Sequence, residues 1–103
     1  MSGTFTYKLT TESELFSFNY SPILAVGETI LTASCTVQVK DGTDPNPSDI
    51  KVGSPAIDGA VVVQRIYGGL SGVIYRLEMT VTKSLTNTYT LVGDLAIYTP
   101  LEV

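Results

Sequence analysis

The stretch Ile66-Tyr-Gly-Gly-Leu-Ser-Gly-Val-Ile-Tyr-Arg-Leu-Glu-Met-Thr-Val-Thr-Lys83 decides the fold of this chain. A glycine-rich turn leads into a segment in which one face is apolar throughout and the other is mostly polar. The apolar face consists of Val73, Tyr75, Leu77, Met79 and Val81. Because a period of two over this length is the signal of a half-buried strand, we predict one over residues 73–83. We expect it to be a central strand of a small sandwich.

The turn before this strand has a structural interpretation. Gly68, Gly69 and Gly72 permit positive φ where the chain reverses after the preceding strand. Tyr75, close to the strand start, suggests a tyrosine corner, in which the hydroxyl hydrogen-bonds back across an inter-sheet connection. No Gly-Lys-Ser/Thr follows these glycines, so they do not form a phosphate-binding loop. We therefore assign Gly68, Gly69, Gly72 and Tyr75 to a structural turn.

The rest of the chain also reads as short strands. Alternation and β-branched residues predict them over residues 4–9, 15–20, 28–40, 50–52, 60–67 and 88–98. The pattern contains no convincing helix, and turn signals recur roughly every 8–12 residues, as in immunoglobulin-like folds. We therefore predict an all-β protein: a single immunoglobulin-like antiparallel β-sandwich of about six to seven strands.

Several local expectations follow from the same patterns. Lys8 falls on the polar face of the first strand, opposite Phe5, Tyr7 and Leu9. Residues 53–55 read as a turn, and residues 60–67 as a strand buried on both faces. In the last strand Tyr89 is expected to point inward, with Leu91, Leu95 and Ile97. Gly93, in the middle of that strand, suggests a bulge.

Composition bounds the class of protein. A length of 103 residues predicts one domain, residues 1–103, with residues 1–14 as an extended arm or edge strand. Hydrophobic residues make up 44% and charged residues 16%, which excludes a disordered chain. The absence of histidine removes histidine catalysis. Cys35 lies on an apolar face, so we interpret it as a small buried hydrophobe.

Charge and hydropathy limit the kinds of partner that this chain can bind. The 6 basic residues are scattered and the net charge is −4, so we expect no nucleic-acid binding. No apolar run approaches the roughly 18 residues of a membrane span, so we expect no membrane insertion. The first residues resemble no signal peptide, which predicts synthesis in a cytoplasm.

The candidate interaction residues lie in one loop and two strand ends. Asp41, Asp44 and Asp49 belong to a loop with two prolines. Their carboxylates are ligands of the kind that Ca²⁺ prefers, but their spacing is not that of an EF-hand. We interpret them as solvated turn aspartates. Tyr67 and Tyr98 lie where the opposite face is also apolar, so we expect one to be exposed and available for protein contact. These five residues are the candidate partner contacts; we predict no catalytic residue, cofactor or metal.

Two segments carry a family resemblance. The first runs from Lys8 through Leu15, Tyr20-Ser-Pro22 and Gly27-Glu-Thr-Ile30; the second is Gly68-Gly-Leu-Ser-Gly-Val-Ile-Tyr-Arg-Leu77 followed by Thr80-Val-Thr-Lys-Ser84. Their order and spacing resemble a family of small tailed-bacteriophage virion proteins, described as fibre–tail adaptor or tail/neck structural proteins. The likeness covers about residues 8–98. The family often has Trp where this chain has Tyr20 and Cys35, and both substitutions keep apolar character.

The resemblance implies an immunoglobulin-like sandwich without enzymatic activity, present in multiple copies in a virion. We therefore expect a structural adaptor of a phage tail, neck or fibre attachment that forms a symmetric homo-oligomeric ring and contacts other virion proteins. Contact through the first or last strand, or through the loop at residues 41–49, is the expected mode. The alternative is an immunoglobulin-like carbohydrate- or receptor-binding decoration module.

Overall fold

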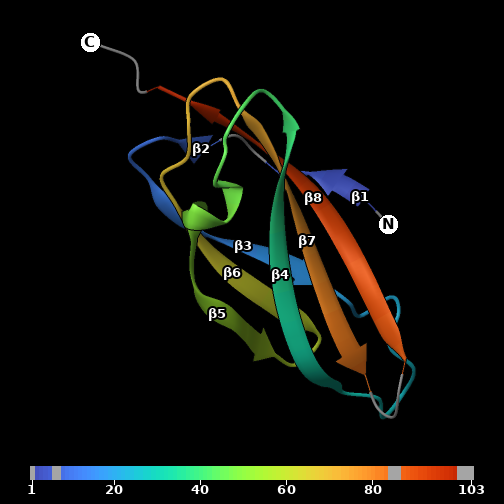
Figure 1. Cartoon of the computed structure of the whole chain (residues 1–103). Coiled ribbons are helices and arrows are strands. Elements are labelled where there is room, and N and C mark those ends of the chain that lie inside the picture. The colour runs from blue at the N-terminus through green and yellow to red at the C-terminus, as the bar shows by residue number, and fades with distance from the viewer. Residues whose placement is uncertain (1, 6–7, 84–86, 100–103) are drawn as a thin grey trace.

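Two β-sheets pack face to face in the computed structural model, which describes residues 2–5, 8–83 and 87–99 (Figure 1). One sheet has the order β1-β8-β7-β4, with β2 also paired to β8; the other has the order β3-β6-β5. The strands are β1 (Ser2–Thr4), β2 (Lys8–Leu9), β3 (Ser13–Asn19), β4 (Ile30–Asp41), β5 (Lys51–Asp58), β6 (Val61–Tyr67), β7 (Ile74–Lys83) and β8 (Thr88–Tyr98). A short 3-10 helix, η1 (Pro47–Ile50), precedes β5. The predicted all-β sandwich is confirmed.

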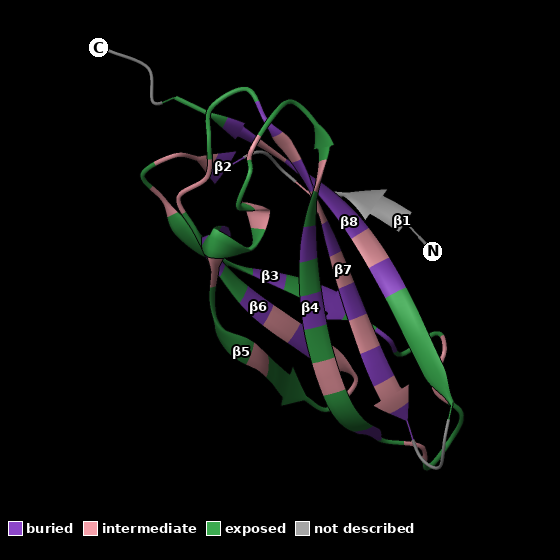
Figure 2. Ribbon diagram, viewed as in Figure 1, coloured by how far each residue is buried: buried purple, intermediate pink, exposed green. Residues whose placement is uncertain are grey.

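Strand β7 lies between β8 and β4 and supplies the centre of the core (Figure 2). Its inward side chains Tyr75, Leu77, Met79 and Val81 are all buried, as the alternation predicts. The three-stranded sheet covers them with a second set of buried side chains: Phe16, Phe18, Val62 and Ile66. Burying apolar area from both sheets is the main favourable contribution to folding.

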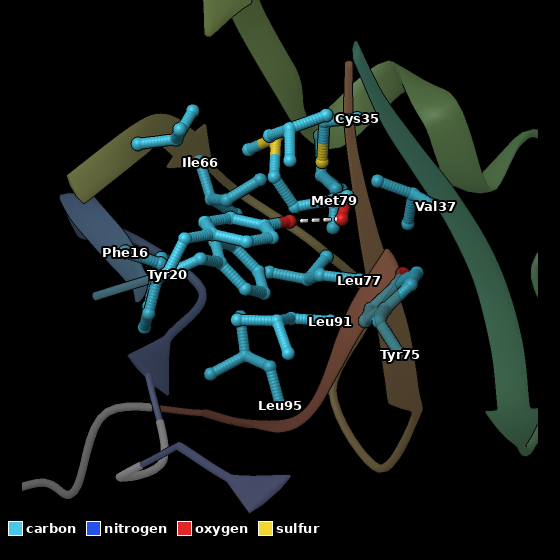
Figure 3. Close-up of a cluster of buried hydrophobic side chains, with 14 of the residues drawn as sticks. Phe16, Tyr20, Cys35, Val37, Ile66, Tyr75, Leu77, Met79, Leu91 and Leu95 are labelled. Carbon is cyan, nitrogen blue, oxygen red and sulfur yellow. Dashed lines mark hydrogen bonds between the residues drawn. The ribbon is translucent and has the colours of Figure 1, made fainter. Parts of the chain in front are cut away.

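Tyr20, directly after β3, extends into this core. Its ring lies among Met79, Leu77 and Leu91, and its hydroxyl donates a hydrogen bond to the carbonyl oxygen of Met79 (Figure 3). Burial raises the pKa of the Tyr20 hydroxyl to about 12. The phenol therefore stays neutral and keeps donating this bond, which a fully buried hydroxyl requires.

The first strand differs from the prediction in direction. β1 and β2 both pair with β8 in parallel, with Ser2 beside Val92 and Lys8 beside Ile97. Every other strand pair is antiparallel among the described residues. Alternation within one strand carries no information on the direction of its neighbour, so the sequence could not reveal this. Tyr7 lies outside the described residues.

Lys8 is buried, and its assignment to a polar outer face was wrong. Its ammonium donates to the carbonyl oxygens of Leu9, at 2.6 Å, and Glu12, at 2.7 Å. Burial lowers the pKa of Lys8, while the carboxylates of Glu12 and Glu14 act in the opposite direction. The two carbonyl contacts make burial of the ammonium tolerable and hold the turn between β2 and β3 closed.

Gly93 is the site of a ring contact and not of a bulge. The register between β7 and β8 runs without interruption past the Leu77–Gly93 pair. A Cβ at residue 93 would lie 2.3 Å from the Phe5 ring, so only glycine leaves room for it. Phe5 in turn packs on Phe16 and Phe18 with ring centroids 4.9 and 5.4 Å away. The absence of a side chain at Gly93 thus allows Phe5 of the N-terminal segment to pack against the core.

The turn predicted at residues 53–55 lies inside β5 as an irregularity. The pairing with β6 shifts between Val52 and Ala56. Buried Gln64 of β6 compensates, because its side-chain amide donates to the carbonyl oxygens of Val52 and Gly53, each at 3.2 Å. Only one face of β6 is buried, contrary to prediction, since its sheet has a partner sheet on one side alone.

Tyr89 differs from its predicted inward position, because it is 36% exposed near the end of the β7–β8 pair. The ammonium of Lys83 lies 4.7 Å from the centre of its ring, a cation–π contact. Lys83 also pairs with Glu28 at 2.8 Å.

Candidate functional site at the loop end of the sandwich

Four segments meet at one end of the sandwich, which we call the loop end: residues 9–12, 41–50, 67–73 and 98–99 (Figure 1). The N–H of Thr10 donates to the carbonyl of Tyr98 at 2.9 Å. The N–H of Gly72 donates to the carbonyl of Ile97 at 2.9 Å. These backbone bonds tie loops from different parts of the chain to the last strand.

The glycine turn crosses here from β6 in one sheet to β7 in the other. Gly68, Gly69 and Gly72 have φ of 76°, 103° and 83°, in the left-handed region that favours glycine. A Cβ at residue 69 would also lie only 3.0 Å from the side chain of Ile97. Glycine is therefore required at residue 69 for both its backbone and its neighbour.

Tyr75 holds the turn and the acidic loop together. Its hydroxyl accepts a hydrogen bond from the N–H of Leu70 at 3.0 Å and donates one to the Asp44 carboxylate at 2.6 Å. The first bond is the expected feature of a tyrosine corner. Burial, reinforced by the bond to Asp44, raises the pKa of Tyr75 to about 12. A neutral phenol thus joins the two loops.

The acidic loop has its own internal order. The Asp44 carboxylate also accepts from the N–H of Asn46 at 2.9 Å, an Asx turn. The N–H of Asp49 donates to the carbonyl of Asn46 at 3.1 Å, and buried Ile50 anchors the end of η1 in the core. The loop is therefore a positioned element, and Asp44 is a structural acceptor and not the solvated aspartate that we expected.

A hollow of about 290 Å³ opens between the acidic loop and the glycine turn. Its lining residues are Asp44, Asn46, Asp49, Ile50, Tyr67, Gly68, Gly69 and Leu70. Tyr67 is 55% and Leu70 48% exposed, so two large side chains are accessible at the hollow. Carboxylates and an amide on one wall and an exposed aromatic ring on the other form a surface suited to contact with a protein.

The hollow brings together three of the five predicted contact residues, Tyr67, Asp44 and Asp49, with the predicted turn glycines Gly68 and Gly69. Tyr98, 51% exposed, lies at the same end but outside the hollow. Asp41 ends β4 beside Ile74 and also lies outside it. Sequence reasoning expected one of Tyr67 and Tyr98 to be exposed, and both are.

The sequence did not indicate two groups of residues, one at the hollow and one away from it. Asn46 and Ile50 line the hollow, and their signal was only a proline-rich loop followed by an apolar residue. Asp94 lies on the outer face of the larger sheet, where it accepts from Lys40 at 2.6 Å and Arg76 at 3.0 Å. These contacts lower the pKa of Asp94 below its usual value, and the hydrogen bond from Arg76 has the largest effect.

The described residues offer little reactive chemistry. Burial raises the pKa of the Cys35 thiol to about 11, so it stays protonated and unreactive. No group of three or more acidic, cysteine or histidine side chains gathers to hold a metal ion in the part of the chain that the structure describes. That part also contains no helix with the length and apolar character needed to cross a bilayer.

The two packed sheets, with ordered loops and an aromatic–acidic hollow at one end, define the class of the protein: a small all-β sandwich. Within that class, the chain belongs to the family described as podophage GP4 fiber-tail adaptor protein gp77, which it matches over residues 8–92. None of the curated proteins matches the chain in sequence. The family is one of phage structural adaptors, in agreement with the resemblance found in the sequence.

Proposed function

We propose that this chain is a non-enzymatic structural adaptor of a bacteriophage virion, which contacts both tail and fibre components. The observation that carries the proposal is the family match, because it spans residues 8–92 and so includes most of both sheets and three of the four segments of the loop end. An adaptor needs rigid, ordered contact surfaces. The tyrosine corner and the Asp44 bonds supply such order at the loop end.

The loop end is the partner-binding surface in this proposal. Tyr67, Asp44 and Asp49 line its hollow, and Tyr98 and Asp41 lie beside it. Exposed tyrosine is favoured at protein interfaces because it buries much area with little loss of side-chain entropy. Carboxylates at the rim select partners with basic groups and set the salt dependence of binding.

We further propose an immunoglobulin-like topology and assembly as a symmetric ring. The first is supported by the strand set β3-β6-β5 facing β8-β7-β4, with a tyrosine corner at the β6–β7 connection. A ring arises when one heterologous contact repeats until it closes. Each copy in such a ring would present the loop end once, so the ring would engage its virion neighbours several times over.

A charge reversal at the loop end tests this surface. Asp49→Lys places a positive charge on the rim of the hollow, and Asp58→Lys is the matched control, because Asp58 is also exposed but ends β5 at the opposite end of the sandwich. Each variant replaces the wild-type chain during particle assembly, and its amount in purified particles is measured by quantitative mass spectrometry. We expect loss of Asp49→Lys alone. Equal incorporation of both variants would remove the loop end as the contact.

A second candidate is a carbohydrate- or receptor-binding decoration module, and the hollow is the feature that favours it. The exposed Tyr67 ring beside the polar groups of Asn46 and Asp49 is an arrangement that small ligands also use. A glycan array separates the two functions. Saturable binding that Tyr67→Ala abolishes supports the module, and no binding supports the adaptor.

A further inference from the structure

The edges of the two sheets are not equally protected against the addition of another strand. β1 and β2 cover the outer edge of β8 at residues 92–94 and 97–98. On β4, the ammonium of Lys51 donates to the carbonyl of Cys35 at 2.7 Å, which occupies an outward-facing acceptor. On β5, the irregularity between Val52 and Ala56 contains Pro55 and breaks the ladder. Lysines, prolines and bulges are the devices by which proteins block edge pairing.

Strand β3 has neither a lysine, a proline nor a bulge, and its only charged residue is Glu14. It ends its sheet, with β6 on one side and no described strand on the other. Its register with β6 is continuous from Ser13 to Asn19. Leu15 on its outer face is 56% exposed.

The direction of the β3 backbone groups follows from one hydrogen bond. The N–H of Tyr20 donates to the carbonyl of Ala60 at 2.8 Å, and these residues continue the β3–β6 register. Hydrogen-bonded and non-hydrogen-bonded pairs alternate along an antiparallel ladder. The even residues of β3 therefore bond to β6. The odd residues present their N–H and C=O groups to the open edge: Ser13, Leu15, Ser17 and Asn19.

We propose that this edge of β3 binds an extended segment of another virion protein as an additional antiparallel strand. This inference rests on the proposed adaptor function for the identity of the partner, and it assigns a second contact surface apart from the loop end. Strand addition draws its affinity from main-chain hydrogen bonds and its specificity from alternate side chains. Seven residues of open, regular edge are enough for several such bonds.

Glu14 argues against a second copy of this chain as the occupant. If two β3 edges paired antiparallel, odd residues would bond to odd residues, so Glu14 would face an even residue of the other copy. Those residues are Glu14, Phe16, Phe18 and Tyr20. Every such register places the carboxylate against an aromatic ring or another carboxylate, and each of these arrangements is unfavourable.

The same geometry specifies the side chains of the partner segment. A basic residue opposite Glu14 forms a favourable cross-strand pair. Apolar residues suit the positions opposite Phe16 and Phe18. Because the pairing is antiparallel, the partner segment meets Phe18 first and Glu14 last. From its N-terminus it therefore has an apolar residue, any residue, a second apolar residue, any residue and a basic residue. Basic groups on the partner also suit the net charge of −4 on this chain.

Proline substitution tests the edge without touching the β3–β6 ladder. Ser17→Pro removes an N–H that points to the open edge of β3, where proline is tolerated. Ala33→Pro is the matched control. Ala33 lies two residues before Cys35 on β4, so its backbone groups point the same way, and its N–H faces the edge that Lys51 protects. We expect particles to contain at least about tenfold less of Ser17→Pro than of wild type, and unchanged Ala33→Pro. Normal incorporation of Ser17→Pro would overturn the proposal.

Amide hydrogen exchange provides the second measurement, and it decides the question if Ser17→Pro does not fold. In the isolated chain, the amides of Leu15 and Ser17 should exchange quickly and those of Phe16 and Phe18 slowly. In purified particles we expect Leu15 and Ser17 to exchange at least about a hundredfold more slowly. Unchanged rates in particles that contain the chain would overturn the inference and leave the adaptor function intact. Absence of the chain from particles would overturn the adaptor function itself, and concentration-dependent protection in the isolated chain would identify a second copy as the occupant.

Discussion

Tyr75→Phe is the most informative single substitution, because it deletes two hydrogen bonds and leaves the ring in place. The N–H of Leu70 loses its acceptor at 3.0 Å, and the Asp44 carboxylate loses its donor at 2.6 Å. A neutral bond contributes about 1 kcal/mol and one to a charged group about 1.5–3 kcal/mol. Since Asp44 is partly exposed and can recover hydration, we expect the free energy of unfolding to fall by about 2 kcal/mol.

Urea denaturation followed by circular dichroism measures this change. A loss of that size corresponds to a decrease in Tm of roughly 8 °C for a chain of this length. Tyr67→Phe is the control, because Tyr67 is exposed, and it should alter stability by less than about 0.5 kcal/mol. A double-mutant cycle with Asp44→Ala should give a coupling energy of about 1 kcal/mol. Equal, small effects of Tyr75→Phe and Tyr67→Phe would refute the role of the corner.

Three further predictions concern the rest of the sandwich. Gly93→Ala should destabilise the protein by about 1–3 kcal/mol, because its Cβ would clash with the Phe5 ring; in the Phe5→Ala background the same substitution should cost clearly less, and an equal cost would contradict the contact. The pKa of Asp94 is lowered chiefly by Arg76, so this carboxylate stabilises the fold above its usual pKa of 3.8 and the contribution disappears as pH falls through the lower folded value. Urea titrations at pH 2 to 6 should therefore show a smaller acid destabilisation in Asp94→Asn than in wild type, and parallel curves would refute it. The Cys35 thiol should react with Ellman's reagent at pH 8 only after unfolding, since its pKa is about 11, and rapid reaction of the native chain would contradict its burial.

Most of the architecture could be predicted from the sequence, because alternation of apolar and polar residues shows which face of a strand is buried. Residues 73–83 show this best, since all five residues of the predicted inward set are buried, and Lys83 in the same phase is buried as well. The tyrosine corner was also predictable, because glycines that permit a reversal and a tyrosine near the strand start occur together.

The failures have a common physical origin, which is that they depend on tertiary neighbours. A glycine in the middle of a strand suggests a bulge, and the sequence cannot show that the ring of Phe5 occupies the space where a Cβ of residue 93 would lie. The alternation predicts an exposed Lys8, because the sequence does not show that its ammonium has partners. The carbonyl groups that accept its hydrogen bonds come close to it only in the folded turn. Gln64 is buried to satisfy carbonyls released by the irregularity in β5, which is itself a pairing property.

The candidate site was predictable in its residues but not in its form. Tyr67, Asp44 and Asp49 were identified separately, from exposure and loop composition. They converge on one hollow beside the bond between Tyr75 and Asp44, which joins two residues 31 positions apart in the chain. Long-range contacts of this kind leave no periodic signal in a single sequence.

A cryo-electron microscopy reconstruction of the virion that contains this chain tests the adaptor assignment most directly. We expect its density at the junction of tail and fibre, in several symmetric copies, with the loop end around Tyr67 against a neighbouring protein and an added strand beside β3. Particles that lack the chain, or that carry it away from the junction with both surfaces free, would contradict the assignment.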